Sequence, residues 1–154
     1  VALFAFSTSS SAATIPVTLK TVSDDLGVKK DVSSFVIPVG ATINMDGTAI
    51  MQGLATMFIA STAGVDLSIV EYVQIVMLAL VASIGAAAVP SAGTITLALI
   101  LSSLGLPLDA IGLILAVDRI LDMIRTSVNV CGDAAVSCIV AVSEDELDYQ
   151  IYNN

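Results

Sequence analysis

The stretch DRILDMIRTSVNVCGD, residues 118–133, brings several ionisable side chains into a chain that is mostly apolar. On a helix, where each residue turns by about 100°, five of its polar side chains recur at intervals of four, three, four and four residues and fall within an arc of about 80°. We call this set the polar stripe: Asp118, Asp122, Arg125, Asn129 and Asp133. Carboxylates, a guanidinium and an amide on one helix face can bind hydrogen-bond donors, anionic groups and hard cations.

The composition of the chain makes this stripe energetically costly. Of 154 residues, 56% are hydrophobic and 12% are charged, and the mean hydropathy is +0.98, which is typical of a membrane protein. At the centre of a bilayer each charge costs about 2.5 to 3.5 kcal/mol, so the four charges of the stripe cost about 10 kcal/mol or more, comparable with the stability of a whole domain. The stripe must therefore face protein, water or bound ions.

Two explanations compete for the stripe, a salt-bridge ladder and an ion-binding site. A ladder would pair Arg125 with Asp122 or Asp118, but the stripe holds three carboxylates against one guanidinium. Asp46, in a predicted helix break, adds a fourth carboxylate, so four negative charges and one positive charge leave a net minus three. This surplus favours bound cations. Because the sequence has no His but offers Asn, Asp and backbone carbonyls, hard ions held by oxygen are the natural match.

Composition also argues against other classes of protein. Five basic residues against fourteen acidic ones do not supply the basic surface that phosphate contacts need, so we expect no nucleic-acid partner. Cys131 and Cys138 would lie about 10 Å apart along a helix, too far for a disulfide, and we expect them to be small buried apolar side chains. No nucleophile–base pair is visible in the sequence, so we do not expect an enzyme.

Four hydrophobic blocks must position the stripe. We predict an all-α integral membrane fold with two re-entrant helical hairpins, one broken transmembrane helix and one long transmembrane helix. The predicted segments are hairpin 1 at about 1–25, the broken helix at about 34–62, hairpin 2 at about 67–105, the last helix at about 108–142, and an acidic polar tail at 143–154. Because the chain begins within a hydrophobic run, we expect it to be the C-terminal fragment of a longer protein.

Small and helix-breaking residues interrupt the first three blocks. Both hairpins share a plan in which an apolar arm, a tip of small residues, Pro16 or Pro90, and a second apolar arm follow one another. Such a repeated pair is typical of transporters built from inverted repeats, and the half-helix N-termini can receive an anionic group. The INMDGT segment, 43–48, can expose carbonyls around a cavity, although in isolation it also fits a simple Asp-Gly turn.

The polar connections predict which ends share a side of the membrane. Lys29 and Lys30 favour a cytoplasmic loop. Counting crossings from there places the loop 62–66 outside and the tail after Val142 inside. We expect a solvated tail without fixed structure.

Four motifs in this order resemble the glutamate/aspartate transporters, or dicarboxylate/amino acid:cation symporters. SSSAATIP resembles the tip of the first hairpin, GATINMDGTA the broken helix, SIGAAAVPSAG the second tip, and DRILDMIRTSVNVCGD the last helix. The resemblance covers nearly all of residues 5–142. It implies a transport core that moves as an elevator against a scaffold supplied by the rest of the protein, with hairpin 2 as the outer gate.

The resemblance also implies a substrate site. Asp122 would hold the amino group of the substrate, Arg125 its side-chain carboxylate and Asn129 its main-chain carboxylate. The full implied set of substrate-binding residues is Ser9, Ser10, Thr48, Val89, Gly93, Asp122, Arg125 and Asn129. Arg125 marks acidic substrates within the family, and its bidentate fork suits a carboxylate. Asp122 complements an ammonium group, which favours amino acids over plain C4-dicarboxylates.

Sodium ions are the co-transported cations that the resemblance implies, and Asp133 favours sodium over proton coupling. One sodium site would use Gly40, Asn44, Asn129 and Asp133; another would use carbonyls around Thr42, Ser83, Ile84 and Ala86; a third would use Asn44 and Asp46, with further ligands elsewhere in the protein. The chain departs from relatives at Thr8 and Met123, where an additional Arg stands in archaeal or animal members, and at Ala86 and Ser91, where other small residues are common.

These inferences give one functional prediction with alternatives. We expect sodium-coupled symport of aspartate or glutamate by a multi-pass plasma-membrane protein that is a homotrimer at full length. The alternatives are a proton-coupled C4-dicarboxylate or neutral amino acid symporter of the same fold, and a non-transporting, channel-like membrane subunit.

Overall fold

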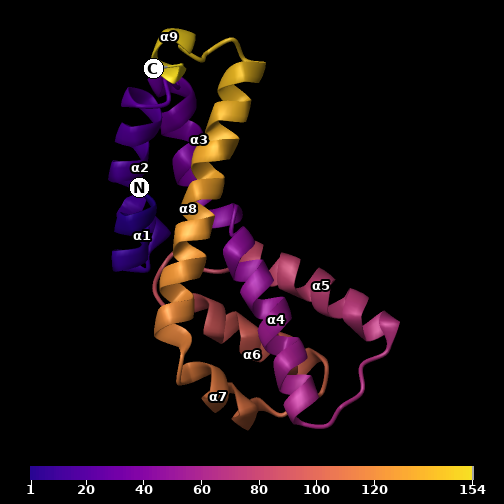
Figure 1. The fold of residues 1–154 in the computed structure, drawn as a ribbon. Helices are drawn as coiled ribbons and strands as arrows, with labels where there is room; N and C mark the ends of the chain where they lie inside the picture. The colour runs from indigo at the N-terminus through magenta and orange to yellow at the C-terminus, as the bar shows by residue number, and fades with distance from the viewer. Residues whose placement is uncertain (154) are drawn as a thin grey trace.

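The computed structural model describes residues 1–153 and is helical nearly throughout (Figure 1). Its elements are α1 (Ala2–Thr8), α2 (Ser11–Asp24), α3 (Lys30–Ile43), α4 (Asp46–Thr62), α5 (Ile69–Ile84), α6 (Ala92–Ser103), the 3-10 helix η1 (Leu108–Ala110), α7 (Ile111–Leu115), α8 (Asp118–Ser143) and α9 (Tyr149–Tyr152). Within residues 1–153 there is no strand, only an isolated bridge between Val28 and Leu147. The all-α prediction is confirmed for this part of the chain.

Helix α8 forms the axis of the molecule. It contacts α1, α2, α3, α4 and α7, and in Figure 1 α1 to α3 run beside it while α4 to α7 gather around its N-terminal end. Its 26 residues give a length of about 39 Å. Among the described helices, only α8 is both long and apolar enough to cross a membrane. The polar stripe therefore lies on the one helix whose length matches a bilayer.

Two apolar cores hold the helices against each other at opposite ends of α8. The α4–α6 core consists of Met51, Ala55, Ile59, Ala60, Leu97, Leu101, Leu106 and Ile114. The α2–α3 core consists of Val22, Val28, Ile37, Ala141 and Leu147. Full burial of a large aliphatic side chain stabilises a fold by about 1.5 to 3 kcal/mol, so each core fixes its group of helices. Between the two cores lie the helix breaks and the polar stripe.

Each interrupted block is a helix, a break and a second helix. The first break holds Ser9, whose φ of 51° is left-handed, and Ser10, whose side chain caps α2 by accepting a hydrogen bond from the Ala13 N–H. The break of the second block falls at Asn44 and Met45. The third spans residues 85–91 and ends at Ser91, with a φ of 61°. Because such φ values are uncommon outside glycine, tertiary contacts must hold both hairpin tips.

The prediction of one last helix over about 108–142 is wrong at its start. The chain forms η1 and α7, turns at residues 116–117, and only then begins α8. The turn lets Ile114 enter the α4–α6 core, where it is 6% exposed. The periodic apolar pattern of the sequence could not reveal this turn, because the turn depends on the packing of Ile114 against helices that are distant in the sequence.

The tail is more ordered than expected. Leu147 packs into the α2–α3 core. The Lys29 ammonium lies 2.5 Å from the Glu146 carboxylate, and this contact raises the pKa of Lys29 above its usual value. The Asp148 N–H also donates to the Gly27 carbonyl oxygen at 2.8 Å. The tail and the α2–α3 loop therefore meet at one end of the molecule, which agrees with their predicted common side. Asn154 lies outside the described residues.

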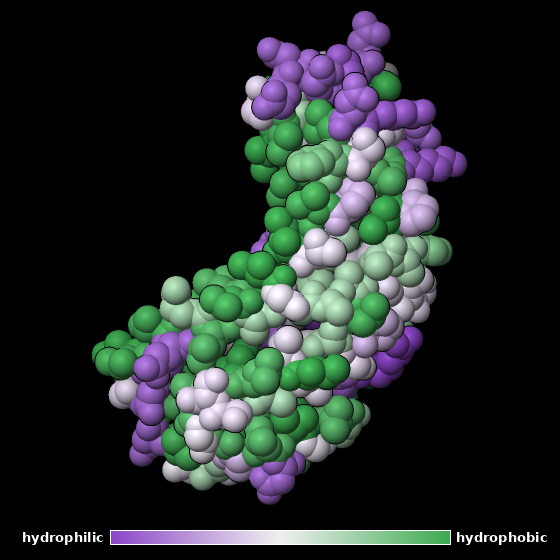
Figure 2. All heavy atoms as spheres, turned by 180° about the vertical axis from the view of Figure 1, so that it is seen from behind, coloured by the Kyte–Doolittle hydropathy of each residue, from purple (hydrophilic) through white to green (hydrophobic). Residues whose placement is uncertain are grey.

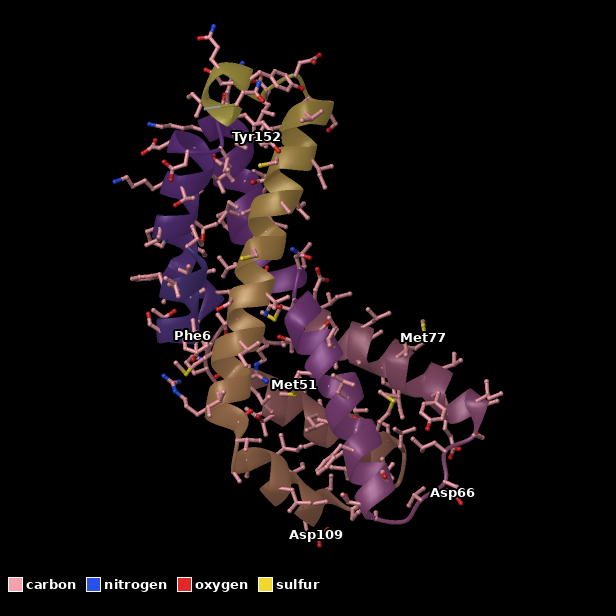
Figure 3. All side chains as sticks on the ribbon, in the orientation of Figure 1. Phe6, Met51, Asp66, Met77, Asp109 and Tyr152 are labelled. Atoms are coloured by element: carbon pink, nitrogen blue, oxygen red, sulfur yellow. The ribbon has the colours of Figure 1, made fainter. Side chains whose placement is uncertain are left out.

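The surface between the two ends is apolar. Leu3 and Ile69 are more than four-fifths exposed, and Figure 2 shows hydrophobic residues over most of the molecule, with hydrophilic residues gathered mainly toward its ends. In Figure 3, Asp66 and Asp109 lie at one end and Tyr152 at the other. A continuous apolar surface of this kind needs a cover of lipid or protein.

Candidate functional site

The polar stripe is buried, as its energetic cost requires. Asp118, Asp122, Arg125, Asn129 and Asp133 are each between 2% and 5% exposed. Their periodicity turns them toward α4 and the two hairpin tips. On the opposite face of α8, Ser127 bonds to α1, whereas Ile120 and Cys131 are exposed, so the expectation that Cys131 is buried is wrong. A neighbouring charge off the stripe, Arg119, is exposed, so burial separates the stripe from an ordinary charged surface.

Arg125 is paired within α8 but not completely. Its Nε and Nη2 atoms lie 2.9 and 2.8 Å from Oδ1 of Asp122. Its Nη1 atom lies 4.0 Å from Oδ1 of Asp118 and has no hydrogen-bond partner among residues 1–153. The salt-bridge ladder therefore exists, but it leaves a buried guanidinium nitrogen available for another acceptor.

Both carboxylates beside Arg125 are also held by the start of α6. The Ser91 N–H donates to Oδ2 of Asp122 at 2.8 Å. The hydroxyl of Ser91 donates to Oδ2 of Asp118 at 3.2 Å, and the hydroxyl of Thr94 donates to Oδ1 of Asp118 at 2.8 Å. The second hairpin tip is therefore bonded to two acids of the stripe.

Asn129 joins the stripe to the start of α4. Its Oδ1 atom accepts the Gly47 N–H at 2.8 Å, and its Nδ2 atom donates to the Thr48 hydroxyl at 3.1 Å. The N–H groups of a first helical turn have no partner within their own helix, and Asn129 satisfies one of them. A Cβ atom on Gly47 would lie 2.5 Å from the Arg125 carbonyl oxygen, so glycine is what allows α4 to cross α8 this closely.

Asp133 lies among residues from the break between α3 and α4. Asn44 donates to its Oδ1 atom at 3.0 Å, and a Cβ atom on Gly40 would lie 2.5 Å from that oxygen. A Cβ atom on Gly132 would meet Asn44 at 3.1 Å and Asp46 at 3.5 Å. Asp133 takes part in no ion pair within the described chain. The structure thus brings Asp46 and the Asn44 amide, which belong to predicted sodium sites, close to the Asp133 carboxylate, whose negative charge no described cationic side chain balances.

The tips of the two hairpins touch each other. The Ser10 hydroxyl donates to the Ala88 carbonyl oxygen at 2.9 Å, and the Ala12 N–H approaches the same oxygen at 3.4 Å. Ser9 is 1% exposed, and its hydroxyl has no hydrogen-bond partner within the described residues. The neighbouring serines therefore differ: Ser10 joins the tips, whereas Ser9 keeps a free polar atom.

A small cavity of about 20 Å³ lies where the tips, α4 and α8 meet. Its lining includes Ala86 and every predicted substrate residue except Ser10. These substrate residues are Ser9, Thr48, Val89, Gly93, Asp122, Arg125 and Asn129. Such a volume holds about one water molecule, whereas small-molecule sites usually enclose about 300 Å³ or more. An amino acid can enter only if the lining moves.

The remaining predicted sodium ligands lie at two helix ends. Thr42 is exposed, and its hydroxyl donates to the Val39 carbonyl at 2.8 Å; the Ser83 hydroxyl donates to the Leu80 carbonyl at 2.9 Å. Ile84 is exposed at the end of α5. Helices α3 and α5 contact each other. The two hydroxyls donate within their own helices but keep oxygen lone pairs, so both these hydroxyls and the backbone carbonyls could contact a cation there.

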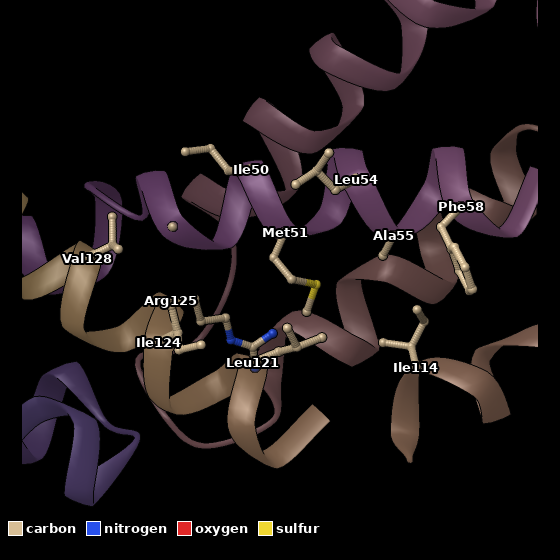
Figure 4. A pocket seen from close by; sticks show the side chains of 11 residues that line it. Ile50, Met51, Leu54, Ala55, Phe58, Ile114, Leu121, Ile124, Arg125 and Val128 are labelled. Atoms are coloured by element: carbon tan, nitrogen blue, oxygen red, sulfur yellow. The ribbon is translucent and has the colours of Figure 1, made fainter. Parts of the chain in front are cut away.

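A larger, apolar pocket lies on another side of α8 (Figure 4). Its volume is about 310 Å³, and its lining is Gly47, Ile50, Met51, Leu54, Ala55, Phe58, Ile114, Leu121, Ile124, Arg125 and Val128. Arg125 is the only charged residue in that lining. Such a wall cannot satisfy both charged ends of an amino acid, so the small polar cavity is the better candidate site despite its size.

Two polar residues near the site were not singled out from the sequence. Thr94 binds Asp118, as described above. Gln52, which is fully buried, donates to the Thr96 hydroxyl and, at 3.4 Å, to the Gly93 carbonyl oxygen. Gln52 is the one amide side chain of α4, and that could have drawn attention to it. Thr94 is one of several small polar residues of α6, and the sequence holds no signal that distinguishes it.

Comparisons with known proteins agree with the motifs. The profile of the sodium:dicarboxylate symporter family matches residues 1–143. The excitatory amino acid transporter of Caenorhabditis elegans is 52% identical over 136 residues, which are 88% of this chain and 27% of that protein. Excitatory amino acid transporter 2 of Mus musculus is 52% identical over 145 residues, and that of Homo sapiens is 50% identical over 145 residues, in both cases 94% of this chain and 25% of the relative.

The chain therefore spans about a quarter of the length of the curated relatives it matches. The family profile, in contrast, covers nearly the whole chain, so the resemblance inferred from the four motifs is confirmed. The chain belongs to the sodium:dicarboxylate symporter family.

Proposed function

We propose that the full-length protein is a sodium-coupled symporter of acidic amino acids, aspartate or glutamate. The observation that carries this proposal is the guanidinium of Arg125, which is buried beside a polar cavity and whose Nη1 has no hydrogen-bond partner within residues 1–153. A buried, unsatisfied donor of this kind is costly unless an acceptor reaches it, and a carboxylate matches its geometry and charge. The names of the similar transporters, all excitatory amino acid transporters, support the same substrate class.

The other cavity residues complement the rest of an amino acid. Asp122 would receive the ammonium group in place of the Ser91 N–H that it now accepts. Asn129 and the free Ser9 hydroxyl would bind the main-chain carboxylate. Since a C4-dicarboxylate has no ammonium group, it would leave Asp122 unmatched.

Sodium coupling is supported by the surroundings of Asp133. This carboxylate is 2% exposed and accepts a hydrogen bond from one neutral amide. An ionised carboxylate buried in this way is unfavourable without a cation. Sodium held by Asp133, the Asn44 amide oxygen and nearby carbonyls would compensate it, and the substrate's net negative charge adds to the demand for cations.

The proposed transport mechanism follows from helix lengths and surface character. The hairpin arms α1, α2, α5 and α6 contain 7, 14, 16 and 12 residues, so they extend about 10 to 24 Å, less than the hydrocarbon thickness of about 30 Å. This supports re-entrant hairpins whose tips meet inside a lipid bilayer. The extensive apolar surface suits an elevator core that moves against a scaffold within lipid. The family resemblance adds the multi-pass plasma-membrane homotrimer to this proposal.

Isotope uptake by the full-length protein in lipid vesicles tests the function. With sodium, proton and potassium gradients imposed separately, we expect labelled aspartate to accumulate only with an inward sodium gradient. Unlabelled glutamate should compete, whereas succinate and serine should not. Uptake that follows the proton gradient, or competition by succinate or serine, would support the alternative symporters. Ion current without accumulation would instead indicate a channel-like subunit.

A further inference from the structure

The second hairpin tip has two hydroxyls that converge on one buried acid. Asp118 is 5% exposed, and Ser91 and Thr94 each donate a hydroxyl hydrogen bond to a different one of its carboxylate oxygens. Its only nearby cationic group within residues 1–153 is Nη1 of Arg125, at 4.0 Å. The hairpin therefore supplies both hydrogen bonds by which the structure satisfies this carboxylate.

The local helix geometry shows that these bonds are not ordinary capping. Ser91 occupies the N-cap position of α6, where a serine side chain usually accepts from the first turn of its helix. Here the side chain makes no capping bond and donates to Asp118 across to α8. The backbone of Ser91 is left-handed, a conformation that needs support from tertiary contacts.

We propose that Asp118, Ser91 and Thr94 form a latch that keeps the second hairpin closed independently of substrate and sets the rate at which the site opens. This inference rests on the proposed function, because opening is meaningful only if the cavity admits a substrate. It assigns Ser91 and Thr94 as positioning residues, since their hydroxyls act through Asp118 and not on the substrate.

The two acids bonded to the tip have different roles in this scheme. Asp122 accepts the Ser91 N–H, and a substrate ammonium group competes for the same acceptor. Asp118 accepts only hydroxyls from the tip, so a bound substrate need not displace them. The latch can therefore close again over an occupied site. Weakening it should speed opening without changing the preference for acidic over neutral amino acids.

Distance measurement by electron paramagnetic resonance tests the latch in the full-length protein in lipid vesicles. One spin label is placed on the exposed tip residue Ala87 and the other on the exposed α8 residue Ile120, in a background without other cysteines. The test variants are Thr94→Val and Ser91→Ala, which remove one hydroxyl each. The matched variants are Thr94→Ser, which keeps the hydroxyl, and Ser103→Ala, which removes a hydroxyl of α6 that bonds only its own helix.

Without sodium or substrate, we expect each hydroxyl-removing variant at the latch to raise the ratio of open to closed tip populations by about tenfold or more, since tenfold is the lower end of the effect of losing a hydrogen bond to a charged group. Thr94→Ser and Ser103→Ala should match the wild type. If neither Thr94→Val nor Ser91→Ala lengthens the distance relative to Thr94→Ser, the latch proposal is wrong.

Parallel uptake measurements separate the two proposals. Faster aspartate exchange in Thr94→Val, with unchanged selectivity against serine, supports a gating role. A wild-type protein that transports no acidic amino acid would refute the proposed function but would leave the substrate-free distance result to decide the latch. A change in substrate selectivity with an unchanged distance would overturn the latch.

Discussion

Replacement of Gly93 by alanine should displace the guanidinium of Arg125, the proposed carboxylate-binding group, without adding or removing a charged side chain. A Cβ atom at this position would overlap Nη1 of Arg125 and would lie 2.7 Å from its Cζ atom, whereas ordinary contacts begin at 3.4 Å. The guanidinium must therefore retreat by about 0.7 Å or more, and its 2.8 and 2.9 Å bonds to Asp122 must change with it. Loss of one charge-assisted hydrogen bond to the substrate, worth about 1.5 to 3 kcal/mol, lowers affinity about 10- to 150-fold.

Equilibrium binding of labelled aspartate in saturating sodium measures this effect in the purified full-length protein. Gly53→Ala is the matched control, because Gly53 is helical and a Cβ atom there meets nothing within 4 Å. The control should bind like the wild type and be slightly more stable, since alanine favours helix over glycine. Wild-type aspartate affinity in Gly93→Ala would refute the placement of Arg125 at the substrate.

Three further substitutions probe other parts of the account. Gly40→Ala would set a Cβ atom 2.5 Å from the Asp133 carboxylate and should raise the sodium concentration needed for half-maximal aspartate binding at least tenfold. An unchanged sodium titration would argue against a sodium site at Asp133. Ser10→Ala removes both the α2 cap and the bond to Ala88, a loss of about 1 to 2 kcal/mol, and should make a cysteine introduced at the tips more accessible to a thiol reagent. Unaltered accessibility would show that the tips do not depend on this bond. Leu147→Asp places a charge in the α2–α3 core, so it should lower the melting temperature of the detergent-solubilised protein and expose the tail to proteolysis. A wild-type melting temperature and wild-type resistance to proteolysis would contradict the observed packing of the tail.

The sequence was most informative where periodicity and energetic cost coincided. Four charges in an apolar helix must be kept away from lipid, and the helical spacing identifies the face that they share. The stripe from Asp118 to Asp133 faces the protein interior, one of the environments that this reasoning allows. The helix breaks were predictable because Asn, Asp, Gly, Ser and Pro each weaken a helix by a local mechanism. That these breaks complete a site around a cavity was expected from the residues, whereas the role of each residue in that site was implied by the family resemblance.

Tertiary contacts explain what the sequence did not reveal. The turn before α8 exists because Ile114 enters a core built by distant helices. Leu147 is one apolar residue in an acidic tail, and its burial depends on the α2–α3 core. Thr94 resembles any small polar residue of an apolar helix until its hydroxyl is placed 2.8 Å from Asp118.

The central claim, that Arg125 receives the side-chain carboxylate of a sodium-coupled substrate, is tested most directly by paired uptake of aspartate and serine into vesicles under a sodium gradient. The wild type should accumulate aspartate and not serine, and Arg125→Cys should reverse that preference. Arg119→Cys, which removes an exposed arginine of the same helix, should behave like the wild type. Retained aspartate uptake with unchanged affinity in Arg125→Cys would contradict the account.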